Sequence, residues 1–211
     1  MFITLEGVEG AGKSTQARML GQRLEAEGHR VVLIEEPGGT ALGQRVREIV
    51  KHARQVTLTP RAEVLLFLAS RAQLVDSVIR PELLNGSVVI CDRFSDSTFA
   101  YQCYGRGLDL PSVRRANAFA VGCLVPNLTV LLDVPPECGL LRKPDRQTAN
   151  WDRYEQEGID FHRRVRAGYL QLASQEPARW YVVDALQAPT RVGELVLARV
   201  KAALHSSSGE V

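Results

Sequence analysis

Cysteine is scarce in this sequence, and its spacing argues against two kinds of structure. The four cysteines stand at positions 91, 103, 123 and 138, and no two of them form a CxxC pair. Zinc sites and small disulfide frameworks usually depend on closely spaced cysteines, so neither is expected here. We therefore predict four reduced thiols, as is typical of a cytoplasmic protein.

Long apolar runs are also missing. No stretch approaches the roughly 18 consecutive apolar residues that a membrane-spanning helix needs. Glu6 and Glu9 interrupt the N-terminal region too early for a secretory signal peptide. These absences favour a cytoplasmic protein that has no membrane partner.

A strong excess of charge of either sign is absent as well. The chain has 26 lysines and arginines against 24 aspartates and glutamates, which gives a formal net charge of +2. A nearly neutral chain is not expected to bind nucleic acid through a general positive field. Any positive patch must therefore be local.

The sequence does contain the pattern of an α/β fold. Its 211 residues are 45% hydrophobic, and no internal repeat or long linker divides them, so residues 1–211 are expected to form one domain. Short β-branched runs predict strands at 2–6, 30–34, 87–91, 128–134 and 179–183. Runs that are apolar almost throughout are typical of a parallel sheet covered on both faces.

Helices are predicted between and after these runs. Start and stop signals place them at 13–27, from residue 60 onward, at 153–174 and at 190–204. Thr59 is the expected N-cap of the second helix, because Pro60 suits the first helical position. The polar tail, 205–211, is expected to be frayed.

The most specific local motif follows the first strand. Residues 7–14 read GVEGAGKS, which matches G-x-x-x-x-G-K-[ST] between a strand and a helix. Glycines let backbone N–H groups approach phosphate oxygens, and the helix N-terminus adds partial positive charge. The motif predicts that ATP binds to Gly7, Val8, Glu9, Gly10, Ala11, Gly12, Lys13, Ser14 and Thr15.

Two residues of this P-loop have particular roles. Lys13 is expected to reach the β- and γ-phosphates, and the Ser14 hydroxyl is expected to hold Mg²⁺. The loop alone leaves GTPases, ATPases, motors and small-molecule kinases open. The absence of an NKxD guanine signature argues against a GTPase.

A second polar pair follows another predicted strand. Asp92 and Arg93 come at the carboxyl end of the run 87–91, where α/β folds bind ligands. Asp92 is a second candidate for Mg²⁺, and Arg93 can grip a phosphate bidentately. A plain salt bridge at the end of the strand is the alternative.

Three weaker features allow structural as well as functional interpretations. Phe67 and Arg71 share a helix face, where spacing alone favours core packing over binding of a flat ring. The turn EPGGT at 36–40 is either part of a binding edge or an ordinary tight turn. The polar stretch 142–155 is either a solvated loop, which composition favours, or a mobile lid over a phosphate site.

In this order and spacing, the motifs resemble those of the thymidylate kinases. The similarity runs from FITLEGVEGAGKSTQ through EPGGT, LLFLASR and DRFSDSTFAYQ to the polar stretch 142–155, and so covers nearly the whole chain. It implies a three-layer P-loop NTPase-type fold with a five-stranded parallel sheet, flanking helices and a mobile lid. It also implies a homodimer that transfers the γ-phosphoryl group of ATP to dTMP, with Mg²⁺, in dTTP biosynthesis.

The resemblance also implies the residues of a dTMP site. Phe67 would stack on thymine while Arg71 bonds a carbonyl of the ring. Glu9 would accept a hydrogen bond from the 3′-hydroxyl, and Tyr101 would crowd a 2′-hydroxyl. The full implied set is Glu9, Pro37, Arg47, Phe67, Arg71, Arg93, Thr98, Tyr101 and Gln102.

Position 10 is glycine, and family members that lack an arginine in the P-loop supply that positive charge from the lid. Arg146 is the best match to the lid arginine, and Arg142 and Arg153 are the alternatives. The implied catalytic set is Lys13, Arg93, Arg142, Arg146 and Arg153.

Two further positions bear on the resemblance. Glu35 stands directly before EPGGT, where the family often has arginine, and its negative charge replaces a possible cation on the phosphate side. The resemblance assigns Arg47, with Arg93, to the monophosphate. Residues 183–189 resemble, weakly, the loop beside adenine.

Other functions stay open at this point. A kinase for another nucleoside monophosphate, such as dUMP, would differ mainly in the residues around the base. A nucleotide-binding regulator that has lost transfer would be expected to lack Asp92 and Arg93 or the lid arginines, and this chain keeps both. A structural scaffold has no positive evidence in the sequence.

Overall fold

The computed structural model describes residues 1–52, 56–142 and 153–208, and within them the predicted sheet is confirmed. The strands are β1 (Phe2–Glu6), β2 (Val31–Glu35), β3 (Val88–Asp92), β4 (Leu128–Asp133) and β5 (Trp180–Asp184). They lie in the order β2-β3-β1-β4-β5, and every neighbouring pair is parallel. Each strand begins and ends within one residue of its predicted run.

Burial along the strands depends on their place in the sheet. The inner strands β1, β3 and β4 are buried along almost their whole length. The edge strands are not, since Leu33 of β2 is 44% exposed and Val182 of β5 is 45% exposed. The prediction of strands covered on both faces therefore holds for the inner strands, whereas the helix layers cover the edge strands β2 and β5 only in part.

Helices and shorter helical segments connect the strands. The α-helices are α1 (Lys13–Ala26), α2 (Ala41–Arg47), α3 (Pro60–Leu74), α4 (Arg80–Leu84), α5 (Ser95–Thr98), α6 (Leu110–Val121), α7 (Pro136–Leu141), α8 (Ile159–Gln175) and α9 (Pro189–Ser208). Three π-helical segments are η1 (Glu48–His52), η2 (Val75–Ile79) and η3 (Phe99–Gly105). The predicted start of α3 is confirmed, because Thr59 Oγ1 accepts a hydrogen bond from the Ala62 N–H and Pro60 opens the helix.

Two predicted helix ends are wrong. Helix α8 begins at Ile159 rather than at 153, because Gly158 is extended (φ −66°, ψ 155°) and Arg153 donates its N–H to Lys51 O at 3.2 Å. Residues 153–158 therefore run as a turn beside η1. Helix α9 continues to Ser208, so the described part of the tail is helical; residues 209–211 lie outside the described residues.

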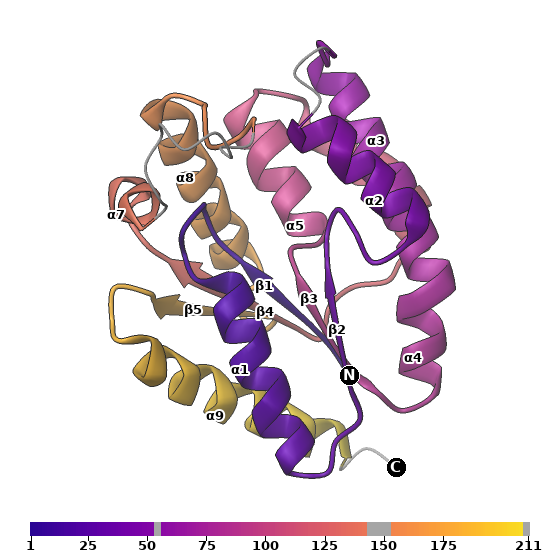
Figure 1. Ribbon diagram of the computed structural model, residues 1–211, viewed down its shortest axis with the longest axis vertical. Coiled ribbons are helices and arrows are strands. Elements are labelled where there is room, and N and C mark those ends of the chain that lie inside the picture. The colour runs from indigo at the N-terminus through magenta and orange to yellow at the C-terminus, as the bar shows by residue number, and fades with distance from the viewer. Residues whose placement is uncertain (53–55, 143–152, 209–211) are drawn as a thin grey trace.

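The helices form a layer on each face of the sheet (Figure 1). Helices α1 and α9 pack against each other in one layer. Helices α3, α6 and α8, with η3, pack together in the other layer. The loops after β1 and β3 meet at the carboxyl edge of the sheet, where the candidate site lies. Among the described helices, none is long and apolar enough to cross a membrane.

Candidate functional site

The P-loop lies between β1 and α1, and its glycines allow close backbone approach. Gly10 has φ +71°, and a Cβ atom built there would lie 1.8 Å from Gly139 O of α7. Gly7 is similarly confined, since its Cβ would lie 2.6 Å from Leu132 O. Packing against α7 and the positive φ therefore favour glycine at position 10 and leave no room there for a larger side chain such as arginine.

Lys13 is held inside the loop. Its Nζ donates to Gly7 O at 3.1 Å and to Val8 O at 2.9 Å. Burial lowers the pKa of Lys13 to about 8, and the charge of Arg93 acts in the same direction. The ammonium group thus lies among the backbone groups that are predicted to cradle phosphate.

Ser14 and Asp92 meet directly. Ser14 Oγ donates to Asp92 Oδ2 at 2.5 Å, across the gap between the start of α1 and the end of β3. The two predicted Mg²⁺ ligands therefore come from different elements and converge beside the P-loop. Hydroxyl and carboxylate oxygens are donors that suit Mg²⁺.

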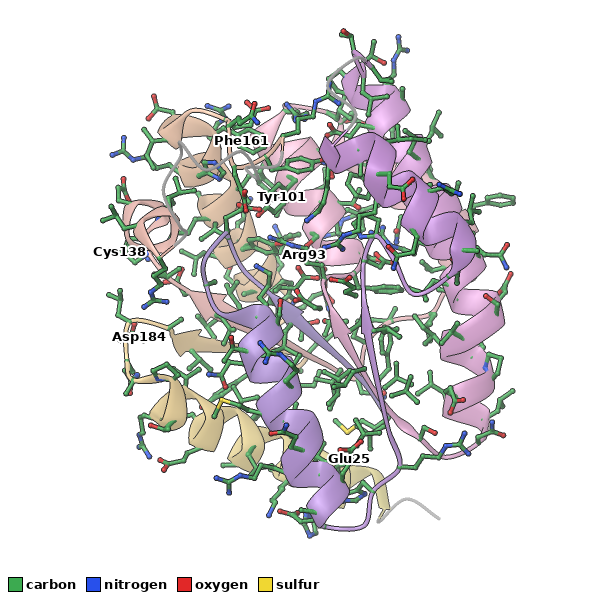
Figure 2. The ribbon with its side chains drawn as sticks, viewed as in Figure 1. Glu25, Arg93, Tyr101, Cys138, Phe161 and Asp184 are labelled. Carbon is green, nitrogen blue, oxygen red and sulfur yellow. The ribbon has the colours of Figure 1, made fainter. Side chains whose placement is uncertain are left out.

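Arg93 occupies a strained turn immediately after β3. Its φ of +73° lies in the left-handed region, which is uncommon for any residue other than glycine. Nη2 donates to Glu9 Oε1 at 3.0 Å, and the guanidinium lies 4.9 Å from the centroid of the Tyr101 ring. Figure 2 shows Arg93 and Tyr101 near the centre of the molecule, at the level of the strand tips. Burial alone would lower the pKa of Arg93, but Tyr101, Tyr169 and Glu9 raise it well above its usual range.

Glu9 lies at the centre of these charges. Its carboxylate accepts from the Tyr101 hydroxyl at 2.7 Å and from Arg93. Burial would raise the pKa of Glu9, but Arg93, His162 and Lys13 together hold it well below its usual range. Glu9 is therefore a buried, ionised acceptor inside the P-loop.

A second hollow opens beside the P-loop cleft. Every residue predicted for the base and the sugar lines it, although these residues lie far apart in the sequence. They are Glu9, Pro37, Phe67, Arg71, Arg93, Thr98, Tyr101 and Gln102. Arg47, the other predicted phosphate contact, lines the main cleft instead.

Arg71 is bonded within the protein. It is 1% exposed, and its guanidinium donates to Glu36 Oε2 at 2.8 Å, to Asn117 Oδ1 at 2.7 Å and to Thr98 Oγ1 at 3.0 Å. Arg71 therefore joins the core to the rim of the hollow. Gln102 is likewise engaged, since its amide donates to Glu63 Oε1 at 2.9 Å.

Glu35 has a partner in the structure. Its carboxylate lies 3.2 Å from Nη1 of Arg47, which also donates to Pro37 O at 2.9 Å. The acidic residue that departs from the family pattern therefore pairs with an arginine predicted to hold the monophosphate. The charge of Glu35, at the end of β2, is therefore balanced locally by an arginine at the end of α2.

The three lid candidates have different positions. Arg142 lines the main cleft and donates to Ala185 O at 2.8 Å and to Gly10 O at 3.4 Å. Arg153 donates to Val56 O at 3.2 Å and is not among the lining residues. Arg146 lies outside the described residues, as does the rest of the predicted lid between residues 143 and 152.

The far end of the main cleft, of about 680 Å³, is formed by the predicted adenine loop. Residues 185–189 and Val192 line this cleft together with the P-loop. A hydrogen bond links the predicted adenine loop to α1, since the side-chain amide of Gln16 donates to Pro189 O at 2.9 Å.

Several buried polar residues of the site were missed by the sequence reasoning. Glu6, Ser97 and Tyr169 form a hydrogen-bonded group behind Arg93. His162 is fully buried, with Nδ1 3.3 Å from Glu9 Oε2. A carboxylate that ends an apolar strand could have drawn attention to Glu6, but no local signal pointed to the three others.

Comparisons with known proteins identify the family of this chain. The thymidylate kinase family model matches residues 5–196. Thymidylate kinase of Desulfovibrio desulfuricans is 52% identical over 197 residues, covering 91% of each chain, and that of Deinococcus radiodurans is 54% identical over 185 residues, covering 88% of each. The crystal structure of thymidylate kinase from Ehrlichia chaffeensis superposes with a TM-score of 0.76 at 33% identity, covering 95% of this chain and 98% of that one. The chain belongs to the thymidylate kinase family.

Proposed function

We propose that the main cleft binds ATP and that the smaller hollow binds dTMP, so that the two nucleotides meet at Glu9 and Arg93. As a thymidylate kinase, the chain transfers the γ-phosphoryl group of ATP to dTMP, giving dTDP and ADP for dTTP synthesis. One observation supports the assignment of the two nucleotides to two adjoining hollows. The two hollows share Glu9, Glu36, Lys51 and Arg93 in their linings, and nucleotides bound in both would approach each other there.

The mechanism depends on position and charge rather than on a strong base. The acceptor is already a phosphate oxyanion, so phosphoryl transfer needs in-line placement and neutralisation of charge. Lys13 would stabilise the transferring group, and Arg93 would hold the acceptor phosphate and reduce the repulsion between two anions. Phe67 would stack on thymine, and Glu9 would orient the sugar through its 3′-hydroxyl.

Mg²⁺ fits the donors that the site offers. Ser14 Oγ and Asp92 Oδ2 supply oxygen donors beside the P-loop. Throughout the described residues, no group of three His, Cys, Asp or Glu side chains could hold a metal, so most other ligands would be phosphate oxygens and water. When bound, Mg²⁺ would neutralise the charge that develops on the phosphates.

Arg142 is the described arginine best placed to act at the ATP side. It already reaches both the P-loop and the adenine loop through Gly10 O and Ala185 O. Arg146, Arg142 and Arg153 all stay candidates for the arginine at the transferring group. Closure of residues 142–155 as a lid would exclude water and so prevent ATP hydrolysis.

A homodimer in the cytoplasm completes the proposal. Three adjoining helices, α2, α3 and α6, expose Leu42, Leu65 and Phe119, and exposed apolar side chains of this size favour association. A second copy of the chain is the partner that the resemblance implies.

The test of this function is a substrate panel. The protein is incubated with ATP, Mg²⁺ and each nucleoside monophosphate in turn, and ADP release is measured. We expect dTMP to be preferred by at least about tenfold in kcat/KM over dUMP, because the thymine methyl adds apolar contact in a narrow pocket. A kcat/KM for dUMP that equals or exceeds the value for dTMP would instead identify the chain as a kinase for dUMP.

A further inference from the structure

We propose that Glu6, Ser97 and Tyr169 are positioning residues that hold the guanidinium of Arg93 in its orientation toward the acceptor phosphate. These three residues are called the Glu6 frame below. The inference rests on the assignment of Arg93 to the acceptor phosphate made above. It concerns residues that contact Arg93; of these, Ser97 also lines the smaller hollow, whereas Glu6 and Tyr169 line neither hollow.

The frame joins three elements in the interior. Glu6 ends β1, Ser97 lies on α5 and Tyr169 lies on α8. Glu6 Oε2 is 2.6 Å from Ser97 Oγ and 2.9 Å from the Tyr169 hydroxyl, and the two hydroxyl oxygens are 2.8 Å apart. Glu6 and Tyr169 are both fully buried, so water does not compete for these bonds.

The frame faces Arg93 with hydrogen-bond acceptors. Nη1 of Arg93 lies 3.3 Å from Ser97 Oγ, 3.3 Å from the Tyr169 hydroxyl and 3.1 Å from Gly7 O. A hydroxyl has one proton to donate and lone pairs to accept with. When Glu6 is ionised, Ser97 and Tyr169 can both donate to it, and their lone pairs are then left for the N–H groups of Arg93. The Glu6 carboxylate therefore determines the direction in which the two hydroxyl groups donate their protons.

Glu6 also fixes the main chain at Arg93. Its other oxygen, Oε1, accepts from the Phe94 N–H at 2.8 Å, directly after the residue whose φ is +73°. Such a backbone conformation persists only when surrounding contacts hold it. One buried carboxylate thus restrains both the backbone and, through two hydroxyls, the tip of the same arginine.

The remaining donors of Arg93 are those that a phosphate needs. Nη2 makes one hydrogen bond, to Glu9, and Nε has no acceptor among the described residues. With Nη1 occupied by the frame and Gly7, the guanidinium cannot rotate without breaking several bonds. Nε–H and the second Nη2 hydrogen are left to face the phosphate, in the paired geometry that arginine uses for such groups.

The first test is Tyr169→Phe, with Tyr181→Phe of β5 as the matched control. Both variants lose one phenolic hydroxyl, but that of Tyr181 makes no hydrogen bond within the described residues. We expect Tyr169→Phe to lower kcat/KM for dTMP by about tenfold, because a loosened catalytic arginine loses its placement, and to leave KM for ATP within about twofold. Tyr181→Phe is expected to leave both constants unchanged. If KM for ATP changed by as large a factor as kcat/KM for dTMP, the role of Tyr169 would be merely structural and the proposal would be overturned.

A double-mutant cycle identifies the partner through which Tyr169 acts. In an Arg93→Ala background, Tyr169→Phe is expected to cause no further loss in kcat/KM for dTMP, because its effect passes through the missing guanidinium. Losses that multiply would show that Tyr169 acts independently of Arg93 and would overturn the proposal. If Arg93→Ala alone left kcat/KM unchanged, the role of Arg93 in the proposed function would fail instead.

Ser97 provides a second pair of variants in case Tyr169→Phe does not fold. Ser97→Ala removes the hydroxyl, whereas Ser97→Thr keeps it. We expect kcat/KM for dTMP to fall in the alanine variant and to recover at least partly in the threonine variant. If the alanine variant and the unmodified protein had equal kcat/KM for dTMP, Ser97 would not be a positioning residue and the proposal would be overturned.

Discussion

Buried charge is the main feature of the site at the scale of single residues. Glu6, Glu9, Lys13 and Arg93 all lie at or just beyond the ends of two neighbouring strands, mostly out of contact with water. Removing a charged group from water is unfavourable unless it is paired or hydrogen-bonded. The pairing here holds the cations where anionic nucleotides would meet.

Lys13→Ala tests the role of the P-loop lysine. We expect kcat to fall by at least about a hundredfold, because the transferring phosphoryl group loses a preorganised cation. The fold should survive, since the loss of a buried charge removes its desolvation penalty as well. Steady-state kinetics and chemical unfolding check both statements. Lys201→Ala, on the exposed face of α9, is the control; near-normal turnover in Lys13→Ala would contradict the assigned role.

The pKa of Glu6 predicts how stability varies with pH. Burial, assisted by the charge of Asp96, raises this pKa to about 7. Between pH 4.5 and 7 the folded protein keeps a proton that the unfolded chain has lost, so this contribution to stability is full below pH 4.5 and is lost as pH rises through 7. The loss is on the order of 3 kcal/mol.

Glu6→Gln checks this dependence, because an amide does not titrate. We expect the variant to gain stability relative to the unmodified protein as pH rises from 5 to 8, since the other titrating groups cancel in the difference. Urea unfolding at several pH values measures it. A difference that stays constant with pH would show that Glu6 titrates at its ordinary value.

At the scale of elements, the P-loop depends on its contact with α7. Gly10 approaches Gly139 so closely that the backbones of loop and helix are in contact. Arg142, just after α7, then bonds both the P-loop and the adenine loop. The position of α7 therefore affects the shape of the phosphate cradle.

Gly10→Ala should separate close packing from backbone preference. Its control is Gly86→Ala, because Gly86 also has a positive φ (+78°) but has no atom within 4 Å of a built Cβ. We expect the control to lose about 1 kcal/mol of unfolding free energy from conformation alone, and Gly10→Ala to lose about 2 kcal/mol or more. Gly10→Ala should also raise KM for ATP. Unfolding free energies are measured by chemical unfolding. Equal losses in the two variants would show that α7 moves to accommodate the added methyl group without a further loss of unfolding free energy.

At the scale of the whole molecule, the adjoining helices α3 and α6 expose large apolar side chains, which is where we propose that a second copy of the chain binds. Phe119 is 94% exposed on α6, and Leu65 is 63% exposed on the adjoining α3. We expect Phe119→Asp to convert a dimer into a monomer, because it places a charge in an apolar interface. Light scattering over a range of concentrations measures this. Leu84→Asp on α4 is the control, and a monomeric unmodified protein would contradict the dimer.

Much of the site could be predicted because its motifs are local. The P-loop, Asp92, Arg93 and the base-site residues each follow from short patterns or from the family resemblance, and the structure brings all of them to one edge of the sheet. The start of α8 at Ile159 was not predictable in the same way. A charged, helix-favouring stretch at 153–158 is bent by its contact with Lys51, which lies about a hundred residues earlier.

The sequence by itself determined the strands, the P-loop between β1 and α1, and the family, because these depend on residue spacing along one stretch of chain. Only the tertiary structure decided that Glu35 pairs with Arg47, that Arg71 is buried and bonded to core residues, and that Glu6, Ser97 and Tyr169 meet behind Arg93. Those three frame residues are up to 163 positions apart. Their hydrogen bonds arise from the parallel order of the strands and the packing of α8 against them. No local sequence pattern could predict these bonds.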